Sequence, residues 1–138
     1  LPIVFPVHPR ARKMIDQFGL THLISTGENI QGIWCTEPLG YLEFLHLNMG
    51  AKLVLTDSGG LQEETTVLGI PCITMRHNTE RPITCTIGTN VLVGNNPDAI
   101  LDAARPILSG DISKGNIPDK WDGKAADRIV DVLLKKNV

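Results

Sequence analysis

Short apolar runs alternate along this chain with amphipathic stretches, and this alternation limits the folds that the chain can adopt. A repeat of strand and helix is typical of a parallel sheet that helices cover on both faces. The sequence therefore predicts an α/β fold, Rossmann-like, with three αβα layers and a mostly parallel sheet of about five strands. The expected strands are residues 2–8, 30–35, 52–56, 72–75 and 89–93.

The segments between the expected strands carry the signals that begin and end helices. Pro9 and Pro97 suit the first turn of a helix, and Gly19 and Gly69 suit the position just after its last turn. Residues 109–122 are polar and are expected to form a surface loop. The expected apolar helix faces are Ala11, Met14, Ile15 and Phe18; Leu42, Leu45 and Met49; Leu61, Thr65 and Leu68; Ile100, Ala103, Ala104, Ile107 and Leu108; and Ala126, Ile129, Val130, Leu133 and Leu134.

Length and charge narrow the class of protein. The chain has 138 residues, so we expect a single domain over residues 1–138. The formal net charge of −2 gives no reason to expect a nucleic-acid or membrane surface. No apolar run approaches the roughly 20 residues of a membrane-spanning helix, and the first residues have no signal-peptide pattern. Because the chain begins at Leu1 rather than at a methionine, we expect it to be part of a longer protein.

The cysteines and aromatic residues bear on the core. Cys35, Cys72 and Cys85 are odd in number, widely spaced and form no Cys-x-x-Cys pair. Small apolar side chains buried in a reducing cytosol explain them better than a metal or redox site does. We therefore expect a cytoplasmic protein without a metal site. Only six residues are aromatic, so the core is expected to be aliphatic.

The residues after the third expected strand have the composition of an anion site. They read Thr56-Asp57-Ser58-Gly59-Gly60 and lie beyond the carboxyl end of a strand, where ligands bind in open α/β sheets. The two glycines are expected to let the backbone turn sharply, and the helix behind them offers free N–H groups to a phosphate. Without a following lysine, the pattern is neither a Walker A loop nor Gly-x-Gly-x-x-Gly. The alternative is a tight turn in which Ser58 only caps the helix.

Acidic residues crowd the first turns of the helix that follows this turn. A carboxylate there stabilises a helix through its dipole, which is sufficient to explain Glu63. Two carboxylates beside a phosphate would repel it. We therefore expect Glu64 to face neutral hydroxyl groups instead, such as those of a ribose.

Two more groups of polar residues follow expected strands. Arg76, His77 and Arg81 follow the fourth strand and could neutralise a diphosphate, although a solvated loop would have the same composition. His8 follows the first strand and is either a catalytic residue or a structural one. Because the carboxyl ends of parallel strands meet at one edge of a sheet, these residues can face the same cleft as the turn.

Eight segments of the chain follow one another in the order of a known protein family. They are residues 5–9, 37–44, 56–64, 68–71, 79–82, 88–89, 92–94 and 122–129. With these segments in register, the chain resembles the non-hydrolysing UDP-N-acetylglucosamine 2-epimerases. This family has two Rossmann-like domains in the glycosyltransferase-B arrangement, with the UDP-sugar in the cleft between them, and the chain resembles most of the second, C-terminal domain.

The resemblance implies a role for each residue of the site, with His8 as the candidate catalytic residue. It implies that the turn holds the diphosphate through one hydroxyl group and the backbone of two glycines. The implied set is Ser58, Gly59 and Gly60 for the diphosphate, Glu64 for the ribose hydroxyls, Arg81 and His8 for the phosphates, and Tyr41 and Phe44 for the uracil.

The resemblance also implies a reaction that needs no metal or nicotinamide cofactor. Enzymes of this family eliminate UDP to leave 2-acetamidoglucal, protonate C2 from the other face and add UDP back, which interconverts UDP-N-acetylglucosamine and UDP-N-acetylmannosamine. Charge develops on the leaving diphosphate, so a preorganised anion site assists the reaction. The implied partners are a UDP-sugar, the N-terminal domain and, in the full enzyme, a second copy in a homodimer.

Two departures from the family pattern bear on activity. Ile83 stands where the family often has glutamate. The acidic catalytic residues of the family lie in its first domain, so the chain alone is expected to be inactive. The first, central strand of the second domain is also missing, so we expect a gap in the sheet unless rearrangement or another copy of the chain closes it.

Two other functions stay open on the sequence. One is a glycosyltransferase of the same architecture, which would share the diphosphate-binding turn. The other is a non-catalytic module that binds a nucleotide-sugar or serves in assembly.

Overall fold

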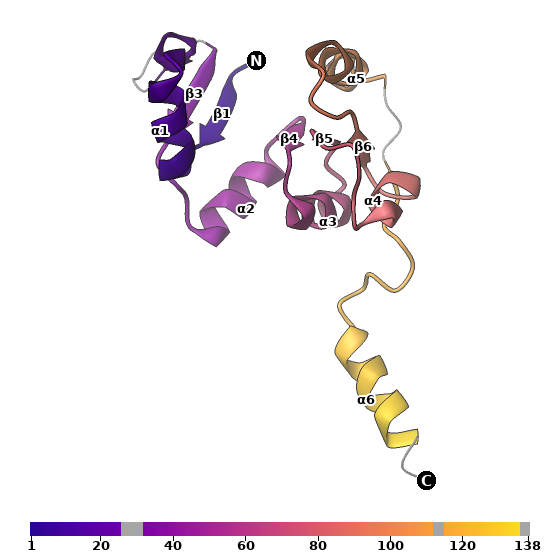
Figure 1. The fold of residues 1–138 in the computed structure, drawn as a ribbon. Coiled ribbons are helices and arrows are strands. Elements are labelled where there is room, and N and C mark those ends of the chain that lie inside the picture. Colours follow the sequence, from indigo (N-terminus) through magenta and orange to yellow (C-terminus); the bar gives the residue numbers. More distant parts are fainter. Residues whose placement is uncertain (26–31, 112–114, 136–138) are drawn as a thin grey trace. The chain divides into compact units, whose positions relative to one another are not determined.

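The computed structural model describes residues 1–25, 32–111 and 115–135 and confirms the α/β class (Figure 1). Helices and strands alternate along the chain, and the strand pairs are parallel. The strands are β1 (Ile3–Pro6), β2 (Ile24–Ser25), β3 (Ile33–Thr36), β4 (Val54–Thr56), β5 (Cys72–Thr74) and β6 (Asn90–Leu92). The helices are α1 (Pro9–Gln17), the 3-10 helix η1 (Leu20–Leu23), α2 (Tyr41–Met49), α3 (Gly59–Leu68), α4 (Pro82–Thr86), α5 (Pro97–Ser109) and α6 (Ala125–Lys135).

The chain divides into two compact units, Leu1–His46 and Leu47–Val138. The first contains a sheet of order β1-β3-β2, and the second a sheet of order β4-β5-β6. The expectation of one sheet of about five strands is therefore wrong in this respect, because the described strands form two sheets of three. In these sheets β1 and β4 are edge strands, each with a neighbour on one side only.

The first unit is built around β3, which pairs with β1 from Ile3↔Ile33 to Pro6↔Thr36. Val7 and Cys35 are its buried apolar residues. The expected apolar face of α1 is not buried, since Met14 is 46% and Phe18 is 64% exposed. Strands of two to four residues offer little apolar surface against which this helix could pack.

The helix α2 begins at Tyr41. The carboxylate of Glu43 accepts a hydrogen bond from the Gly40 N–H at 2.9 Å and so satisfies one of the free groups at the helix start. Its expected apolar face is also largely open, because Leu42 is 75% and Met49 is 61% exposed.

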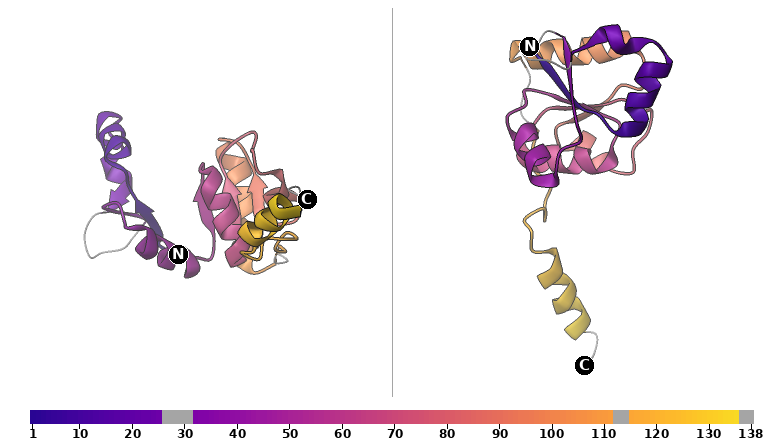
Figure 2. Two further views of the ribbon diagram at one scale, coloured as in Figure 1. Left: turned by 90° about the horizontal axis from the view of Figure 1, so that it is seen from below. Right: turned by 90° about the vertical axis from the view of Figure 1, so that its left-hand side faces the viewer.

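The second unit has three layers, because α3 and α4 lie on one face of the β4-β5-β6 sheet and α5 lies on the other (Figures 1 and 2). β4 pairs with β5 from Val54↔Cys72 to Thr56↔Thr74, and β5 pairs with β6 from Cys72↔Asn90. The helix α5 starts as expected, with the Asn96 side chain accepting hydrogen bonds from two backbone N–H groups of its first turn.

The core of the second unit is only partly aliphatic, in contrast to the expectation. Cys72 and Ile73 have no exposed surface, but the fully or almost fully buried residues also include several polar ones. Of the α3 residues expected to face the sheet, Thr65 is buried while Leu61 and Leu68 are half-buried. The buried polar residues of this unit are Asn48, Thr56, Gln62, Thr65, Thr66, Thr74, Thr84 and Asn90.

The remaining expectations concern the ends of the elements and the C-terminal part. Ile30, the expected start of the second strand, and residues 112–114 of the expected loop lie outside the described residues. The apolar face of α6 is exposed, with Ile129 at 59% and Leu133 at 59%. None of the helices in the described ranges has the length and apolar character that crossing a membrane requires.

Replacing Gly88 by alanine is expected to lower the free energy of unfolding by about 1–3 kcal/mol. An alanine Cβ there would lie 2.5 Å from the Thr66 hydroxyl oxygen and 2.6 Å from the Thr84 carbonyl oxygen, so a helix would have to shift. Gly50→Ala is the matched control, because its nearest new contact is the Leu47 carbonyl oxygen at 3.7 Å. Urea unfolding measures the difference, and equal stabilities of the two variants would contradict this packing.

Cys72 is expected to resist alkylation in the folded protein. Burial raises the pKa of its thiol, an effect that hydrogen bonds with Thr65 and Thr74 partly oppose. Because the thiolate is the reactive species, iodoacetamide at about pH 8 should label Cys72 only after unfolding in urea. Cys85 is half-buried and should react sooner in the folded state. Mass spectrometry measures both sites, and equal rates in the folded chain would contradict the burial of Cys72.

Candidate functional site

The polar segments that follow β4 and β5 leave the sheet at the same edge. The two strands are parallel neighbours whose last residues, Thr56 and Thr74, are paired in register. The Met75 N–H then donates to the Thr56 carbonyl oxygen at 2.8 Å, and this hydrogen bond holds the two segments side by side just beyond the strands. We call residues 56–60 the turn and residues 75–81 the loop. This edge is the place where parallel α/β sheets bind ligands.

The hydroxyl group of Ser58 in the turn has no hydrogen-bond partner among the residues that the structure describes. Ser58 occupies the cap position of α3, but its side chain makes no capping hydrogen bond to this helix. Its backbone N–H instead donates to the Thr56 hydroxyl at 3.0 Å. The alternative in which Ser58 only caps the helix is therefore not what the structure shows, and the hydroxyl is free to donate to a ligand.

The two glycines of the turn belong to the helix itself. Gly59 and Gly60 are the first residues of α3, and neither has a positive φ. The expectation that they let the chain turn sharply is wrong, because both already have the backbone conformation of the helix. They leave the first turn of the helix bare of side chains of its own: within 4 Å a Cβ on Gly60 would find only the Ser58 hydroxyl oxygen, at 3.9 Å, and one on Gly59 would meet the Arg81 side chain at 3.7 Å. Helical N–H groups without covering side chains are suited to an anion.

Arg81 reaches this helix start from the loop. Its guanidinium carbon and Nη1 would each be 3.7 Å from a Cβ on Gly59, so the group lies over the first residue of α3. Its Nε lies 3.1 Å from Glu63 Oε2, at an angle that makes an ion pair but no hydrogen bond. The structure thus brings a guanidinium, a free hydroxyl and a bare helix N-terminus together at one edge of the sheet.

The other cationic residues of the loop have different neighbours. Arg76 forms a two-pronged ion pair with Glu80, with nitrogen–oxygen distances of 3.0 and 3.3 Å. The Glu80 backbone and the Arg76 side chain, both hydrogen-bonded to this carboxylate, lower the pKa of Glu80. His77 packs on the backbone of Gly94, where a Cβ would lie 2.5 Å from its ring. Of the expected cationic cluster, Arg81 is the residue that lies beside the turn.

The two carboxylates of α3 differ in their surroundings. Glu63 pairs with Arg81, which sequence reasoning missed because it assigned Glu63 only to the helix dipole. Glu64 is half-buried and takes part in no ion pair within the described ranges, so its carboxylate is available to a ligand.

Three of the predicted site residues belong to the first unit. His8 caps α1, because its Nδ1 accepts a hydrogen bond from the Arg10 N–H at 3.2 Å. Tyr41, the first residue of α2, is 64% exposed, and Phe44 is half-buried one turn later. Their grouping with the turn and the loop of the second unit stays a prediction.

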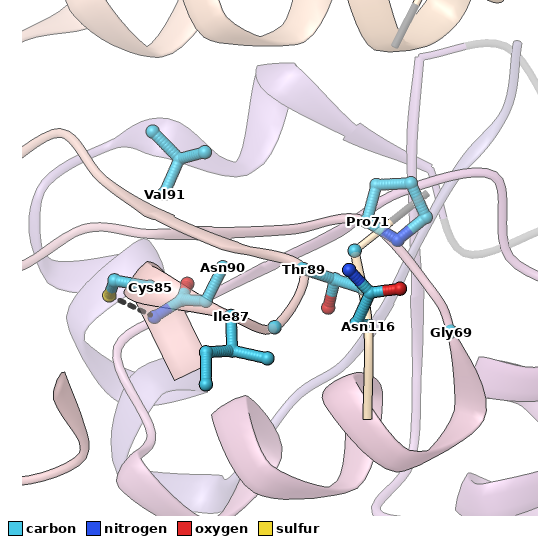
Figure 3. Close-up of a pocket in the computed structure, with 10 residues that line it drawn as sticks. Gly69, Pro71, Cys85, Ile87, Thr89, Asn90, Val91 and Asn116 are labelled. Atoms are coloured by element: carbon cyan, nitrogen blue, oxygen red, sulfur yellow. Dashed lines mark hydrogen bonds between the residues drawn. The ribbon is translucent and has the colours of Figure 1, made fainter. Parts of the chain in front are cut away.

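A separate pocket lies at the opposite end of the strands in the second unit (Figure 3). It is bordered by Pro71, which precedes β5, and by Thr89 and Asn90 at the start of β6. Cys85 also lines it and accepts a hydrogen bond from Asn90 Nδ2 at 3.3 Å. None of the predicted site residues lines this pocket.

The comparisons with known proteins agree on one family. The model of the family described as UDP-N-acetylglucosamine 2-epimerase matches residues 1–134. A UDP-N-acetylglucosamine 2-epimerase of Methanococcus maripaludis is 43% identical over 132 residues, which are 96% of this chain and 35% of that protein.

Solved structures agree with the sequence matches. The structure of UDP-GlcNAc 2-epimerase from Methanocaldococcus jannaschii is similar with a TM-score of 0.78 and 42% identity, over 97% of this chain and 36% of that one. The enzyme from the same organism in complex with UDP-GlcNAc and UDP has a TM-score of 0.76 and 41% identity over the same shares. The chain therefore spans about a third of the length of these relatives.

Proposed function

The chain belongs to the UDP-N-acetylglucosamine 2-epimerase family, and we propose that it forms the UDP-binding part of an enzyme that interconverts UDP-N-acetylglucosamine and UDP-N-acetylmannosamine. The observation that carries the proposal is the position of Arg81 over the bare N-terminus of α3, beside the unused Ser58 hydroxyl. A solved relative is described in complex with UDP-GlcNAc and UDP, which supports a UDP-sugar as the ligand.

In this proposal the turn binds the diphosphate. Backbone N–H groups of Gly59 and Gly60, the Ser58 hydroxyl and the Arg81 guanidinium supply donors and positive charge to its oxygens. The diphosphate gains negative charge as the bond to the sugar breaks. Donors that are already in place stabilise that charge without reorganising at the moment of reaction.

The rest of the nucleotide would contact residues of both units. The free carboxylate of Glu64 suits the ribose hydroxyls, because one carboxylate can accept from two of them. Tyr41 and Phe44 are proposed to lie at the uracil, and His8 near the phosphates as the candidate catalytic residue. Residues 1–138 would then act as one UDP-sugar-binding domain, although the described structure divides into two compact units.

The whole reaction needs more than this chain in our proposal. The family resemblance assigns the acidic residues that move the C2 proton to another domain, and the enzyme is proposed to act as a homodimer in the cytoplasm. The match to the epimerase model along residues 1–134 supports this function over a glycosyltransferase or a non-catalytic module.

Turnover separates these functions. The natural protein that carries this chain is expected to convert UDP-N-acetylglucosamine to its C2 epimer without any acceptor, which NMR of the sugar follows directly. The 138-residue chain alone is expected to bind UDP without turning over. Transfer of the sugar to an acceptor with no change at C2 would overturn the epimerase proposal. Conversion by the chain alone at the rate of the natural protein would show that the acidic residues lie here.

Two single substitutions test the binding site. Ser58→Ala and Glu64→Ala are each expected to weaken UDP binding by about 1–3 kcal/mol, the scale of a lost hydrogen bond to a charged group. Ser109→Ala is the control, because among the described residues its hydroxyl bonds to Pro106 and Asp111 at the end of α5. Calorimetric titration with UDP measures all three. If both site variants bind UDP as the control does, the turn is not the diphosphate site.

A further inference from the structure

A polar network crosses the interior of the second unit beneath the turn and the loop. Gln62, Thr74 and Thr84 have no exposed surface, and Asn90 is 3% exposed. These residues come from α3, β5, α4 and β6, and Thr79 joins them from the loop. Buried polar groups destabilise a fold unless they are hydrogen-bonded, so each partner in the network constrains the others.

The Gln62 amide can satisfy its neighbours in one orientation only. The Ser58 carbonyl oxygen accepts but cannot donate, so the Gln62 nitrogen must face it, and the two atoms lie 3.3 Å apart. Gln62 Oε1 then faces two donors, Thr79 Oγ1 at 2.6 Å and Asn90 Nδ2 at 3.2 Å. The Asn90 amide is oriented in turn by the Thr74 hydroxyl, which donates to its Oδ1 at 2.6 Å.

Thr79 extends the network to the backbone of Arg81. The Thr79 hydroxyl donates to Gln62 and accepts from the Arg81 N–H at 2.9 Å. The Thr84 hydroxyl donates to the Arg81 carbonyl oxygen at 2.8 Å, so both backbone groups of Arg81 are held. Since the Arg81 side chain lies over Gly59, the same network fixes the point from which it reaches the helix.

We propose that Gln62 and Thr79 are positioning residues of the diphosphate site, an inference that rests on the function proposed above. Gln62 holds Ser58 directly and Arg81 through Thr79, so the hydroxyl and the guanidinium are set relative to each other before the ligand arrives. Donors that are ordered in advance lose less entropy on binding. Gln62 suits this task better than glutamate, because a carboxylate could not donate to the Ser58 carbonyl oxygen.

If Gln62 and Thr79 position the diphosphate-binding groups, variants at these residues should weaken the binding of ligands that contain the diphosphate. A residue that only stabilises the fold should affect every ligand of the site equally. A residue that positions Ser58 and Arg81 should affect the diphosphate and spare the nucleoside. The comparison of UDP with uridine therefore separates a positioning role from a merely structural one.

The experiment titrates the natural protein with UDP and with uridine. Thr79→Val removes the hydroxyl at nearly constant volume, and we expect it to raise the Kd for UDP about ten-fold and that for uridine less than about two-fold. Thr79→Ser keeps the hydroxyl and should bind UDP as tightly as the unsubstituted protein. If Thr79→Val does not fold, Thr79→Ala takes its place in the experiment. Thr66→Val is the control and should leave both affinities unchanged, because the buried Thr66 hydroxyl donates to the Gln62 backbone carbonyl, at 2.8 Å, and to no other group in the described part of the chain.

A double variant tests whether Thr79 acts through Arg81. In an Arg81→Ala background, Thr79→Val should weaken UDP binding by less than about two-fold, because the group that it positions is gone. An undiminished ten-fold loss would overturn the inference, as would equal losses for UDP and uridine in Thr79→Val alone. If the unsubstituted protein binds UDP no more tightly than uridine, the turn is not a diphosphate site, and the inference falls together with the proposed function.

Discussion

The hydrogen bonds of the buried Gln62 amide are the constraint on which the second unit depends. A side-chain amide without exposed surface must find partners inside the protein, and those of Gln62 come from the turn, the loop and β6. An apolar residue at this position would pack with many neighbours equally well. The amide accepts only one arrangement of donors and acceptors, and it therefore fixes how the segments around the site lie relative to one another.

The sequence predicts the elements of this unit well and its interior poorly. The apolar runs before Ser58 and after Pro71, and the Asn96 cap with Pro97 after it, specify β4, β5 and the start of α5 through local chemistry. Local chemistry does not predict the hydrogen bonds of Asn90, because its partner Gln62 is 28 residues away in the sequence. A polar residue on a helix is normally assigned to the solvent face, so only the tertiary structure shows that Gln62 is buried.

The short elements escaped prediction for a related reason. The helix α4 has five residues and η1 has four, too few for a helical period to be recognised. The apolar faces of α1 and α2 are recognisable in the sequence, yet they remain largely exposed in the structure. Periodicity shows that a face is apolar but does not show what covers it.

The site residues were predicted from their place in the topology and not from periodicity. Their position after parallel strands brought Ser58 and Arg81 together, as expected, while the role of the two glycines depended on a backbone angle that the sequence does not specify.

The ion pair between Glu63 and Arg81 resolves an apparent conflict in the site. The Glu63 carboxylate, which follows the first turn of α3, would repel a diphosphate if it faced the ligand alone. It lies instead against the Arg81 Nε, and Glu80 Oε2 lies 3.9 Å from Nη1, which is an ion pair beyond hydrogen-bond distance. Neither carboxylate therefore accepts a hydrogen bond from the two Nη groups of the guanidinium. Guanidinium groups bind planar or tetrahedral oxyanions through pairs of such donors. Glu63 thus reduces the net charge of the site and occupies the Nε side of the guanidinium, so a two-pronged contact with a phosphate is left to the end-on pair of Nη groups, at the cost of some attraction.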